Sequence, residues 1–237
     1  MKKYYSVSIK PGNTGTYFYN SFFKKYNIDA EYSALQSDVS NFTQLIDYYK
    51  YIANGMSISM PFKTKVLEVL KSTISFDELA LQYNSCNTVV FDKNTGYNAD
   101  LFGVIELSKQ LPNQVSILGF GSMGKMFYKY LHKSHNVIVY SRSLNNWHLR
   151  HSDTESIINC TIYGTLCLES PLDYIPKNTK TIIDLAIKKN KLQSQAEGIE
   201  YIDGLEFYKY QFIKQFYYYT NIVISNLEFD EMAKAYV

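Results

Sequence analysis

Hydrophobic and polar residues follow two different periods along the chain, and each change of period marks a new element. Alternation with a period of two predicts strands over Tyr4–Ile9 and Met56–Met60. Apolar residues at helical spacing predict helices over Tyr17–Tyr26 and Lys63–Leu70. The other elements expected in this half are a helix that Asp38 caps and that ends near Tyr51, a helix over Asp77–Tyr83, a strand over Thr88–Phe91 and a turn over Asp92–Gly96.

Pro112-Asn113 interrupts the pattern after a helix predicted over Asp100–Leu111, so we place a domain boundary near this dipeptide. The elements expected beyond it are strands over Gln114–Leu118, Val137–Tyr140, Ser156–Asn159, Thr181–Leu185 and Glu200–Ile202, and helices over Lys125–Lys133 and Leu205–Tyr219. Strands that alternate with helices predict an α/β fold with mainly parallel sheets.

The composition is that of a chain that can bury a core. Hydrophobic residues make up 46% of its 237 residues and charged residues 19%, and this length is sufficient for two domains. The formal net charge of +2 gives no electrostatic reason to expect a nucleic-acid partner. No apolar stretch reaches the about 18 residues of a membrane span, and Met1–Lys10 lacks the apolar core of a secretory signal. We therefore expect a cytoplasmic monomer or homodimer without a membrane partner.

Three residue types invite functional interpretations that we do not favour. The 23 Tyr residues do not alternate with basic residues, so we interpret them as occupants of positions that Phe or His could fill rather than as a stacking surface. Cys86, Cys160 and Cys167 have no metal-ligand spacing and are expected to be buried thiols. His148 and His151 have the spacing of a metal pair on a helix, but we favour a polar surface segment and expect no metal.

A GxGxxG sequence, Gly119-Phe-Gly121-Ser122-Met123-Gly124, lies directly between an apolar strand and an amphipathic helix. Gly119 permits a tight turn, Gly121 lets the backbone approach a pyrophosphate, and Gly124 lets the helix pack closely on the strand. The helix that begins with Ser122 and Met123 offers N–H groups and a favourable dipole to phosphates. The sequence therefore predicts a dinucleotide-binding loop in a Rossmann domain, with a glycine-rich turn in an empty Rossmann-like domain as the alternative.

The residues after the next strand distinguish between the two nicotinamide dinucleotides. Sites for NAD usually carry Asp or Glu about 20 residues after the glycines, where the carboxylate binds the ribose 2′-hydroxyl. This chain has Ser141-Arg142-Ser143 there. Arg142 can pair with a 2′-phosphate, and the hydroxyls of Ser141 and Ser143 can donate to it. We therefore expect NADP (NADPH) as the cofactor, with a solvated surface Arg as the alternative.

Four segments resemble motifs of the shikimate dehydrogenase family, in the order that they have in the family. They are Gly55-Met-Ser-Ile-Ser-Met-Pro-Phe-Lys63, Asn84-Ser-Cys-Asn-Thr-Val89, Gly96-Tyr-Asn-Ala-Asp100 and Gly204-Leu-Glu-Phe-Tyr-Lys-Tyr-Gln211. The glycine-rich loop lies between the third and the fourth, so the resemblance extends over nearly the whole chain. It implies an N-terminal α/β substrate-binding catalytic domain over residues 1–98, completed by C-terminal helices over 205–237. It also implies an NADP-binding Rossmann domain with its connecting helix over 99–204.

The resemblance also implies roles for single residues. Lys63 and Asp100 match the catalytic Lys and Asp, so Lys63 would transfer a proton to or from the reacting oxygen and Asp100 would orient it. The implied substrate contacts are Ser59, Asn87 and Gln211, and the further cofactor contacts are Thr161 and Gly204. Asn13 and Thr14, in the segment that matches the family's two Ser, are expected to donate hydrogen bonds to the substrate in their place. Taken alone, Lys63 is a residue at a helix start and Asp100 an N-cap. From the joint pattern we expect the two to face each other across the cleft between the domains.

Other positions depart from the family pattern, and they bear on the substrate. Asn13 and Gly15 stand where the family has two Ser that hold the substrate carboxylate, Ser57 replaces an Asn, and Asn146 replaces a second basic residue of the cofactor site. We therefore expect an NADP-dependent oxidoreductase that interconverts a secondary alcohol and a ketone on a small, cyclic polar substrate, either 3-dehydroshikimate/shikimate or a modified analogue. A non-catalytic or repurposed nucleotide-binding relative is the alternative.

Overall fold

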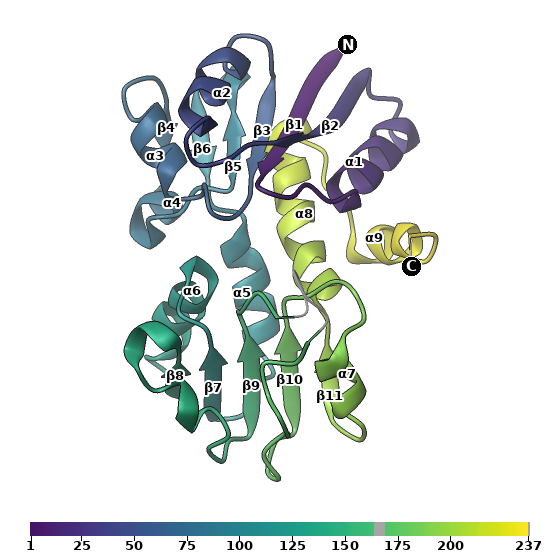
Figure 1. Cartoon of the computed structure of the whole chain (residues 1–237). Helices are drawn as coiled ribbons and strands as arrows, with labels where there is room; N and C mark the ends of the chain where they lie inside the picture. Colours follow the sequence, from purple (N-terminus) through teal and green to yellow (C-terminus); the bar gives the residue numbers. More distant parts are fainter. Residues whose placement is uncertain (164–168, 237) are drawn as a thin grey trace. The chain divides into compact units, whose positions relative to one another are not determined.

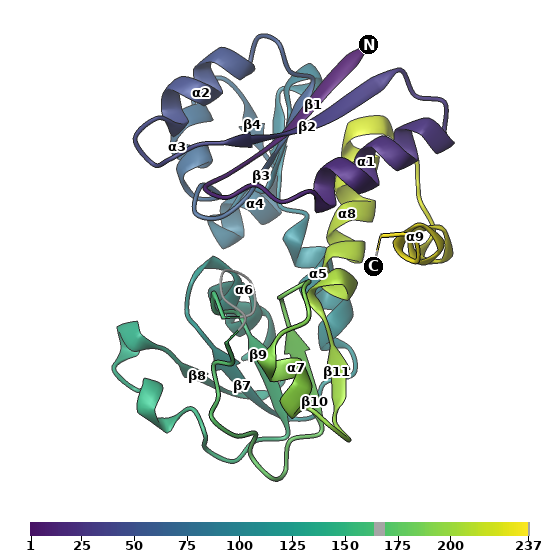
Figure 2. The same ribbon diagram turned by 45° about the vertical axis from the view of Figure 1, so that its right-hand side comes forward.

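The computed structural model describes residues 1–163 and 169–236, and the chain divides into two compact units. The first unit contains Met1–Asp100 and Gln211–Val237, and the second contains Leu101–Tyr210. Each unit is built around a sheet of its own (Figure 1 and Figure 2). The fold is α/β, as the alternation of strands and helices predicts. The assignment of substrate to one unit and cofactor to the other stays a prediction.

The first unit has a mixed sheet with helices on both faces. Its strands are β1 (Lys2–Ser8), β2 (Ala30–Gln36), β3 (Gly55–Ile58), β4 (Ser75–Phe76), β5 (Thr88–Val90) and β6 (Thr95–Tyr97). Its helical segments are α1 (Thr14–Lys25), α2 (Phe42–Tyr49), α3 (Lys65–Leu70), α4 (Glu78–Tyr83), η1 (Phe91–Lys93), the part of α8 (Gly204–Thr220) from Gln211 onward, and α9 (Asn226–Ala233). The strand order is β2-β1-β3-β5-β6-β4. Because β5 runs antiparallel to both its neighbours, this sheet is less uniformly parallel than the sequence predicts.

The two faces of this sheet bury different residues because successive side chains of a strand point to opposite sides. Met56 of β3 lies on the face covered by α2 and α3, in a core where the rings of Phe42 and Phe62 stack 4.3 Å apart. Gly55 lies on the opposite face, where a Cβ atom would come within 2.7 Å of the ring of Tyr219. Tyr219 belongs to α8 (Gly204–Thr220), which Figure 1 shows beside α1 on this face.

An aromatic cluster fills the space between this face and the helices α1, α8 and α9. Its members are all at most 2% exposed: Tyr4, Phe18, Tyr19, Phe22, Phe23, Tyr32, Phe212, Phe216 and Phe229. The rings of Tyr19 and Tyr32 stack 4.1 Å apart, and Phe18 stacks on Phe229 at 4.6 Å. These Tyr residues occupy core positions that Phe also fills. In the run Tyr217–Tyr219 only Tyr217 is exposed, so the run does not form an open stacking surface.

The second unit has a five-stranded parallel sheet. Its strands are β7 (Gln114–Leu118), β8 (Asn136–Tyr140), β9 (Ser156–Asn159), β10 (Thr181–Asp184) and β11 (Glu200–Ile202), and its helical segments are α5 (Asp100–Ser108), α6 (Ser122–Leu131), η2 (Arg142–Leu144), η3 (Trp147–Leu149), α7 (Lys191–Gln195) and the first part of α8. The strand order β11-β10-β9-β7-β8 reverses at β7. Ligands of such sheets bind at the carboxyl ends of the strands where the order reverses, which here is the edge after β7 and β9.

The structure corrects several predicted boundaries. Helix α1 begins at Thr14 instead of Tyr17, and α5 ends at Ser108 instead of Leu111. Asp38 does not cap α2, because its carboxylate accepts a hydrogen bond at 2.8 Å from the backbone N–H of Asn41, the residue before that helix. The elements β2, β4 and α7 are absent from the sequence-based prediction. Within the described residues, no helix is both long and apolar enough to cross a membrane.

The aromatic cluster should dominate the stability of the first unit. We predict that Phe212→Ala lowers the free energy of unfolding by about 3–5 kcal/mol, because it leaves a cavity among buried rings. The matched change Tyr217→Ala removes an aromatic ring from the same helix, but this residue is 39% exposed, and its cost should stay below about 1 kcal/mol. Urea unfolding of the two variants measures both values. Equal costs would contradict the assignment of the core.

Candidate active site

Lys63 and Asp100 form an ion pair inside the first unit, with 2.7 Å between Nζ and Oδ2. Asp100 is fully buried at the first residue of α5, and the Lys63 side chain is 14% exposed in the segment between β3 and α3. The other carboxylate oxygen, Oδ1, accepts a hydrogen bond from Nδ2 of Asn87 at 2.8 Å. The pair is therefore a direct contact within one unit, whereas the sequence analysis expects its members on opposite sides of a domain cleft.

Asn87 has a fixed orientation, because both ends of its buried side-chain amide are bonded. Its Oδ1 accepts from the backbone N–H of Ala99 and from the hydroxyl of Thr88, both at 2.8 Å. These two donors identify the oxygen, so the NH₂ group faces Asp100. A buried carboxylate costs free energy unless it is paired and hydrogen-bonded. Asn87 and Lys63 together provide a partner for each oxygen of Asp100.

The other two predicted substrate contacts on this side, Ser59 and Gln211, also belong to the first unit. Ser59 is exposed directly after β3, and Gln211 is partly buried on α8, with its Nε2 3.5 Å from Oε1 of Gln215. Gln215, one helical turn further on, is the more strongly bonded of the two Gln residues, and the sequence analysis does not identify it. The family motif ends at Gln211, and nothing in the local pattern distinguishes a buried polar residue at 215.

The predicted contacts Asn13 and Thr14 are bonded to a residue near the end of the chain. The hydroxyl of Tyr236 lies 2.7 Å from Oγ1 of Thr14 and donates to Oδ1 of Asn13 at 3.2 Å. A Cβ atom on Gly15 would lie 3.1 Å from the ring of Tyr32. Two tyrosines that the sequence analysis does not assign therefore adjoin the segment where the family has its two Ser.

The glycine-rich loop of the second unit has the geometry that the motif requires. Gly119 has a φ of +93°, a conformation that other residues rarely adopt. A Cβ atom on Gly124 would come within 2.0 Å of the carbonyl oxygen of Gly119, whereas one on Gly121 would meet nothing within 4 Å. Gly124 is thus needed for close packing, and the space around Gly121 is open to a ligand. The loop precedes α6, whose first residues are Ser122 and Met123 and whose N-cap, Gly121, provides no side-chain capping bond.

Arg142 follows the second strand of this sheet, at the start of η2, and its side chain is exposed. The hydroxyls of Ser141 and Ser143 lie 2.9 Å apart beside it. Asn146 bonds both to the N–H of Ser141 and to the carbonyl of Val139, at 2.9 and 2.8 Å, so it holds the turn closed. An exposed guanidinium next to two hydroxyls fits a phosphate group.

Thr161 and Gly204, the remaining predicted cofactor contacts, differ in their surroundings. Asn159 holds Thr161 by accepting from its N–H at 3.1 Å and its hydroxyl at 2.7 Å. Thr161 also adjoins the glycine-rich loop, since a Cβ atom on Gly119 would lie 3.1 Å from its Cγ2 atom. Gly204 is buried, and a Cβ atom there would come within 2.3 Å of the carbonyl oxygen of Leu185. Close packing alone therefore requires a glycine at 204.

Among the residues that the structure describes, the thiols and histidines show no catalytic arrangement. Cys86 is buried and Cys160 partly buried, and both are free, while Cys167 lies outside the described residues. Burial raises the pKa of Cys86 to about 12, so its thiol is protonated at neutral pH. His151 lies 3.4 Å from Asp173. In the part of the chain that the structure describes, no three His, Cys, Asp or Glu side chains come together as metal ligands.

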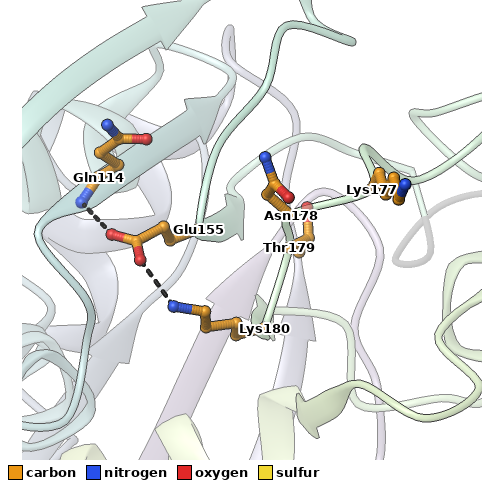
Figure 3. Close-up of a pocket in the computed structure, with 6 residues that line it drawn as sticks. All are labelled: Gln114, Glu155, Lys177, Asn178, Thr179 and Lys180. Atoms are coloured by element: carbon orange, nitrogen blue, oxygen red, sulfur yellow. Dashed lines mark hydrogen bonds and ion pairs between the residues drawn. The ribbon is translucent and has the colours of Figure 1, made fainter.

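An open depression of about 500 Å³ lies in the second unit, lined by Gln114, Glu155, Lys177, Asn178, Thr179 and Lys180 (Figure 3). Figure 3 shows Glu155 between Gln114 and Lys180, and it pairs with Lys180 at 2.8 Å. Gln114 opens β7, and Glu155 and Lys180 directly precede β9 and β10. The depression is therefore at the amino ends of the strands, opposite to the edge at which parallel α/β sheets bind ligands.

The known proteins to which this chain is similar in sequence and in fold are shikimate dehydrogenases. Residues 14–89 match the family model described as the shikimate dehydrogenase substrate binding domain. The "Shikimate dehydrogenase (NADP(+))" of Pyrococcus abyssi is 27% identical and that of Pyrococcus furiosus also 27%, with alignments that cover 86% and 85% of this chain and 86% and 83% of theirs. Among solved structures, shikimate dehydrogenase 1 from Peptoclostridium difficile is similar with a TM-score of 0.81 at 21% identity, over 100% of both chains. The Thermus thermophilus enzyme, solved in complex with NADP(H) and shikimate, gives 0.82 at 18% identity, over 100% of both chains.

The fold and the glycine-rich loop define a class of α/β proteins in which a Rossmann unit accompanies a second α/β unit. The resemblance of the four motifs and the comparisons agree on a narrower assignment. The chain is similar in sequence and in fold to shikimate dehydrogenases, and residues 14–89 match the substrate binding domain of that family.

The glycine-rich loop allows a direct test of the packing argument. We predict that Gly124→Ala destabilises the second unit strongly, because the added methyl group would overlap the carbonyl oxygen of Gly119. Gly121→Ala adds the same methyl group to open space and should leave the thermal unfolding midpoint close to that of the unmodified protein. Differential scanning calorimetry of both variants compares the two. A Gly124→Ala variant as stable as Gly121→Ala would refute the packing argument.

Proposed function

We propose that this protein is an NADP-dependent oxidoreductase that interconverts a secondary alcohol and a ketone on a small, cyclic polar substrate. The first candidate is the 3-dehydroshikimate/shikimate couple, and a modified analogue of these compounds is the second. The observation that carries the proposal is the buried contact between Lys63 and Asp100. The relatives named shikimate dehydrogenase (NADP(+)) support the reaction class and the cofactor.

Lys63 is the proton-transfer residue in this proposal. As a ketone is reduced, negative charge develops on its oxygen, and the ammonium group of Lys63 stabilises that charge and donates the proton. In the oxidation direction the Lys63 amine accepts the hydroxyl proton instead. Asp100 holds the Lys63 side chain at 2.7 Å, and Asn87 holds Asp100. Ser59 and Gln211 are the proposed hydrogen-bonding partners of the substrate hydroxyls.

NADP, when bound, supplies or accepts the hydride. The glycine-rich loop fits its pyrophosphate, because Gly121 leaves open space in front of α6 and its N-cap adds no competing side-chain bond. Arg142, with Ser141 and Ser143, is the proposed binding site of the 2′-phosphate. Thr161 adjoins the loop and is proposed as a further contact.

We also propose that the protein acts in the cytoplasm, as a monomer or homodimer. The free thiols of Cys86 and Cys160 support a reducing compartment. Light scattering of the purified protein measures the oligomeric state.

The central test is the removal of Lys63. Lys63→Ala should lower kcat with 3-dehydroshikimate and NADPH by about 10²-fold or more, the usual range for a lost acid–base group. NADPH binding should change little, because the glycine-rich loop and Arg142 belong to the other unit. The matched control is Lys65→Ala, since Lys65 is exposed and pairs with Glu68 at the surface. Calorimetry first establishes that both variants fold.

Normal turnover in a folded Lys63→Ala variant would refute the assignment of Lys63. If the unmodified protein reduces neither 3-dehydroshikimate nor dehydroquinate and amino-substituted analogues with either nicotinamide, the proposed activity is wrong. A non-catalytic relative would then be the better interpretation.

The preference for NADPH over NADH should depend on Arg142. Arg142→Ala should weaken NADPH binding by about 1.5 kcal/mol, the lower end for a charge-assisted hydrogen bond, because Asn146 replaces a second basic residue. NADH binding should not change, since that cofactor lacks the 2′-phosphate. Lys133→Ala removes an exposed charge from the same unit and is the control. Fluorescence titrations measure the four affinities, and equal affinities for the two cofactors in the unmodified protein would contradict the prediction.

A further inference from the structure

We propose that Gln215 and Thr88 are positioning residues that hold Asn87, and through it the pair Lys63–Asp100, in the reactive arrangement. Neither residue belongs to the set that the sequence motifs assign. The inference rests on the proposed function, because it assumes that Lys63 and Asp100 perform the proton transfer.

Gln215 is hydrogen-bonded through both ends of its buried side-chain amide. It is 1% exposed, on the part of α8 that belongs to the first unit. Its Nε2 donates to the carbonyl oxygen of Asn87 at 2.9 Å and to the hydroxyl of Thr88 at 2.8 Å. Its Oε1 accepts from the hydroxyl of Tyr19 at 3.0 Å. The amide orientation of Gln215 is therefore determined at both ends.

The hydrogen bonds from Gln215 to Asp100 all run in one direction. Gln215 donates to Oγ1 of Thr88, and Thr88 uses its single hydroxyl proton to donate to Oδ1 of Asn87 at 2.8 Å. Asn87 then donates from Nδ2 to Oδ1 of Asp100 at 2.8 Å, and Asp100 accepts from Lys63 through its other oxygen at 2.7 Å. Reversal of any amide in this series would place two donors or two acceptors together. The series therefore specifies which end of Asn87 faces Asp100.

The chemistry of these contacts explains why a buried Gln is required at 215. Only a neutral side chain with a donor and an acceptor at its tip can bond Tyr19, Asn87 and Thr88 together without burying a charge. An apolar residue of the same length would leave the carbonyl of Asn87 and the hydroxyl of Tyr19 without these bonds. Gln215 of α8 thus bonds Tyr19 of α1 and Thr88 at the start of β5. It also bonds Asn87, the residue that contacts Asp100.

The experiment uses four substitutions, of which three each delete one polar group and the fourth, Thr88→Ser, keeps it. Thr88→Val keeps the shape of the side chain but removes both of its bonds in the series, whereas Thr88→Ser keeps the hydroxyl. Thr220→Val makes the same chemical change in α8 and is the matched control. Among the described contacts, the hydroxyl of Thr220 bonds only to backbone atoms of Phe216 and Ile222. Gln215→Met replaces the amide with an apolar chain of similar length. All four are compared with the unmodified protein in kcat, KM and NADPH affinity.

We expect Thr88→Val and Gln215→Met to lower kcat by about threefold to tenfold, the equivalent of one net hydrogen bond. KM and NADPH affinity should stay within about twofold of the unmodified protein, because the lost bonds act on the orientation of Asn87. Thr88→Ser should restore kcat, and Thr220→Val should not affect it. A folded Thr88→Val variant with normal kcat, or a Thr88→Ser variant as slow as Thr88→Val, would overturn the proposal.

Nuclear magnetic resonance provides a readout that does not depend on turnover. In the unmodified protein the side-chain NH₂ group of Asn87 should exchange its protons with solvent slowly. In Thr88→Val and Gln215→Met this exchange should be at least about threefold faster, since a net hydrogen bond is lost. Thr220→Val should leave this exchange rate unchanged. Equal exchange rates in all variants would overturn the positioning role even if no substrate is found. Absence of turnover in the unmodified protein, by contrast, would count only against the proposed function.

Discussion

The burial of one carboxylate, that of Asp100, sets the conditions for the rest of the site. A charged group with no exposed surface is retained only where opposite charge and hydrogen bonds replace water. Lys63 supplies the charge and Asn87 the second bond, at 2.7 and 2.8 Å. Each of these partners must in turn be held, and Thr88 and Gln215 do this for Asn87. Gln215, Thr88, Asn87 and Asp100 are therefore connected in one series of hydrogen bonds that ends at Lys63.

The first unit also buries several tyrosines, whose hydroxyl groups need hydrogen-bond partners. Tyrosines that line the core keep a hydroxyl that must find a partner when buried. Tyr19 donates to Gln215, and Tyr219 lies 2.9 Å from the hydroxyl of Ser57. Burial raises the pKa of Tyr32 to about 12, so this ring adds a neutral hydroxyl next to Gly15. Where the family pattern has two Ser and an Asn, this chain has Asn13, Gly15 and Ser57, and the tyrosines Tyr236, Tyr32 and Tyr219 lie beside these three residues. These phenols are the physical basis for expecting a changed substrate preference.

The fold class, most elements and the residues that meet at Asp100 can be predicted from the sequence, because these depend on short-range pattern and on motifs. Strand β2 (Ala30–Gln36) cannot, because only Tyr32 in it is fully buried and the alternation is weak. Gln215 and Tyr236 could not be predicted either, because Asn87 and Thr88, which Gln215 bonds, and Asn13 and Thr14, which Tyr236 bonds, lie 127 or more residues away along the chain. Contacts at such separations are created by packing, and local periodicity contains no signal for them. For the same reason Asp38 has the appearance of a helix cap but forms a turn before the helix.

A double-mutant cycle on Lys63 and Asp100 tests the central claim most directly. Turnover of 3-dehydroshikimate with NADPH is measured for the unmodified protein, Lys63→Met, Asp100→Asn and the double variant. If the two residues act as one unit, the double variant should be about as slow as the slower single variant, because the first substitution already removes the function of the pair. Losses in log kcat that simply add would show that Lys63 and Asp100 act independently, and would contradict this account.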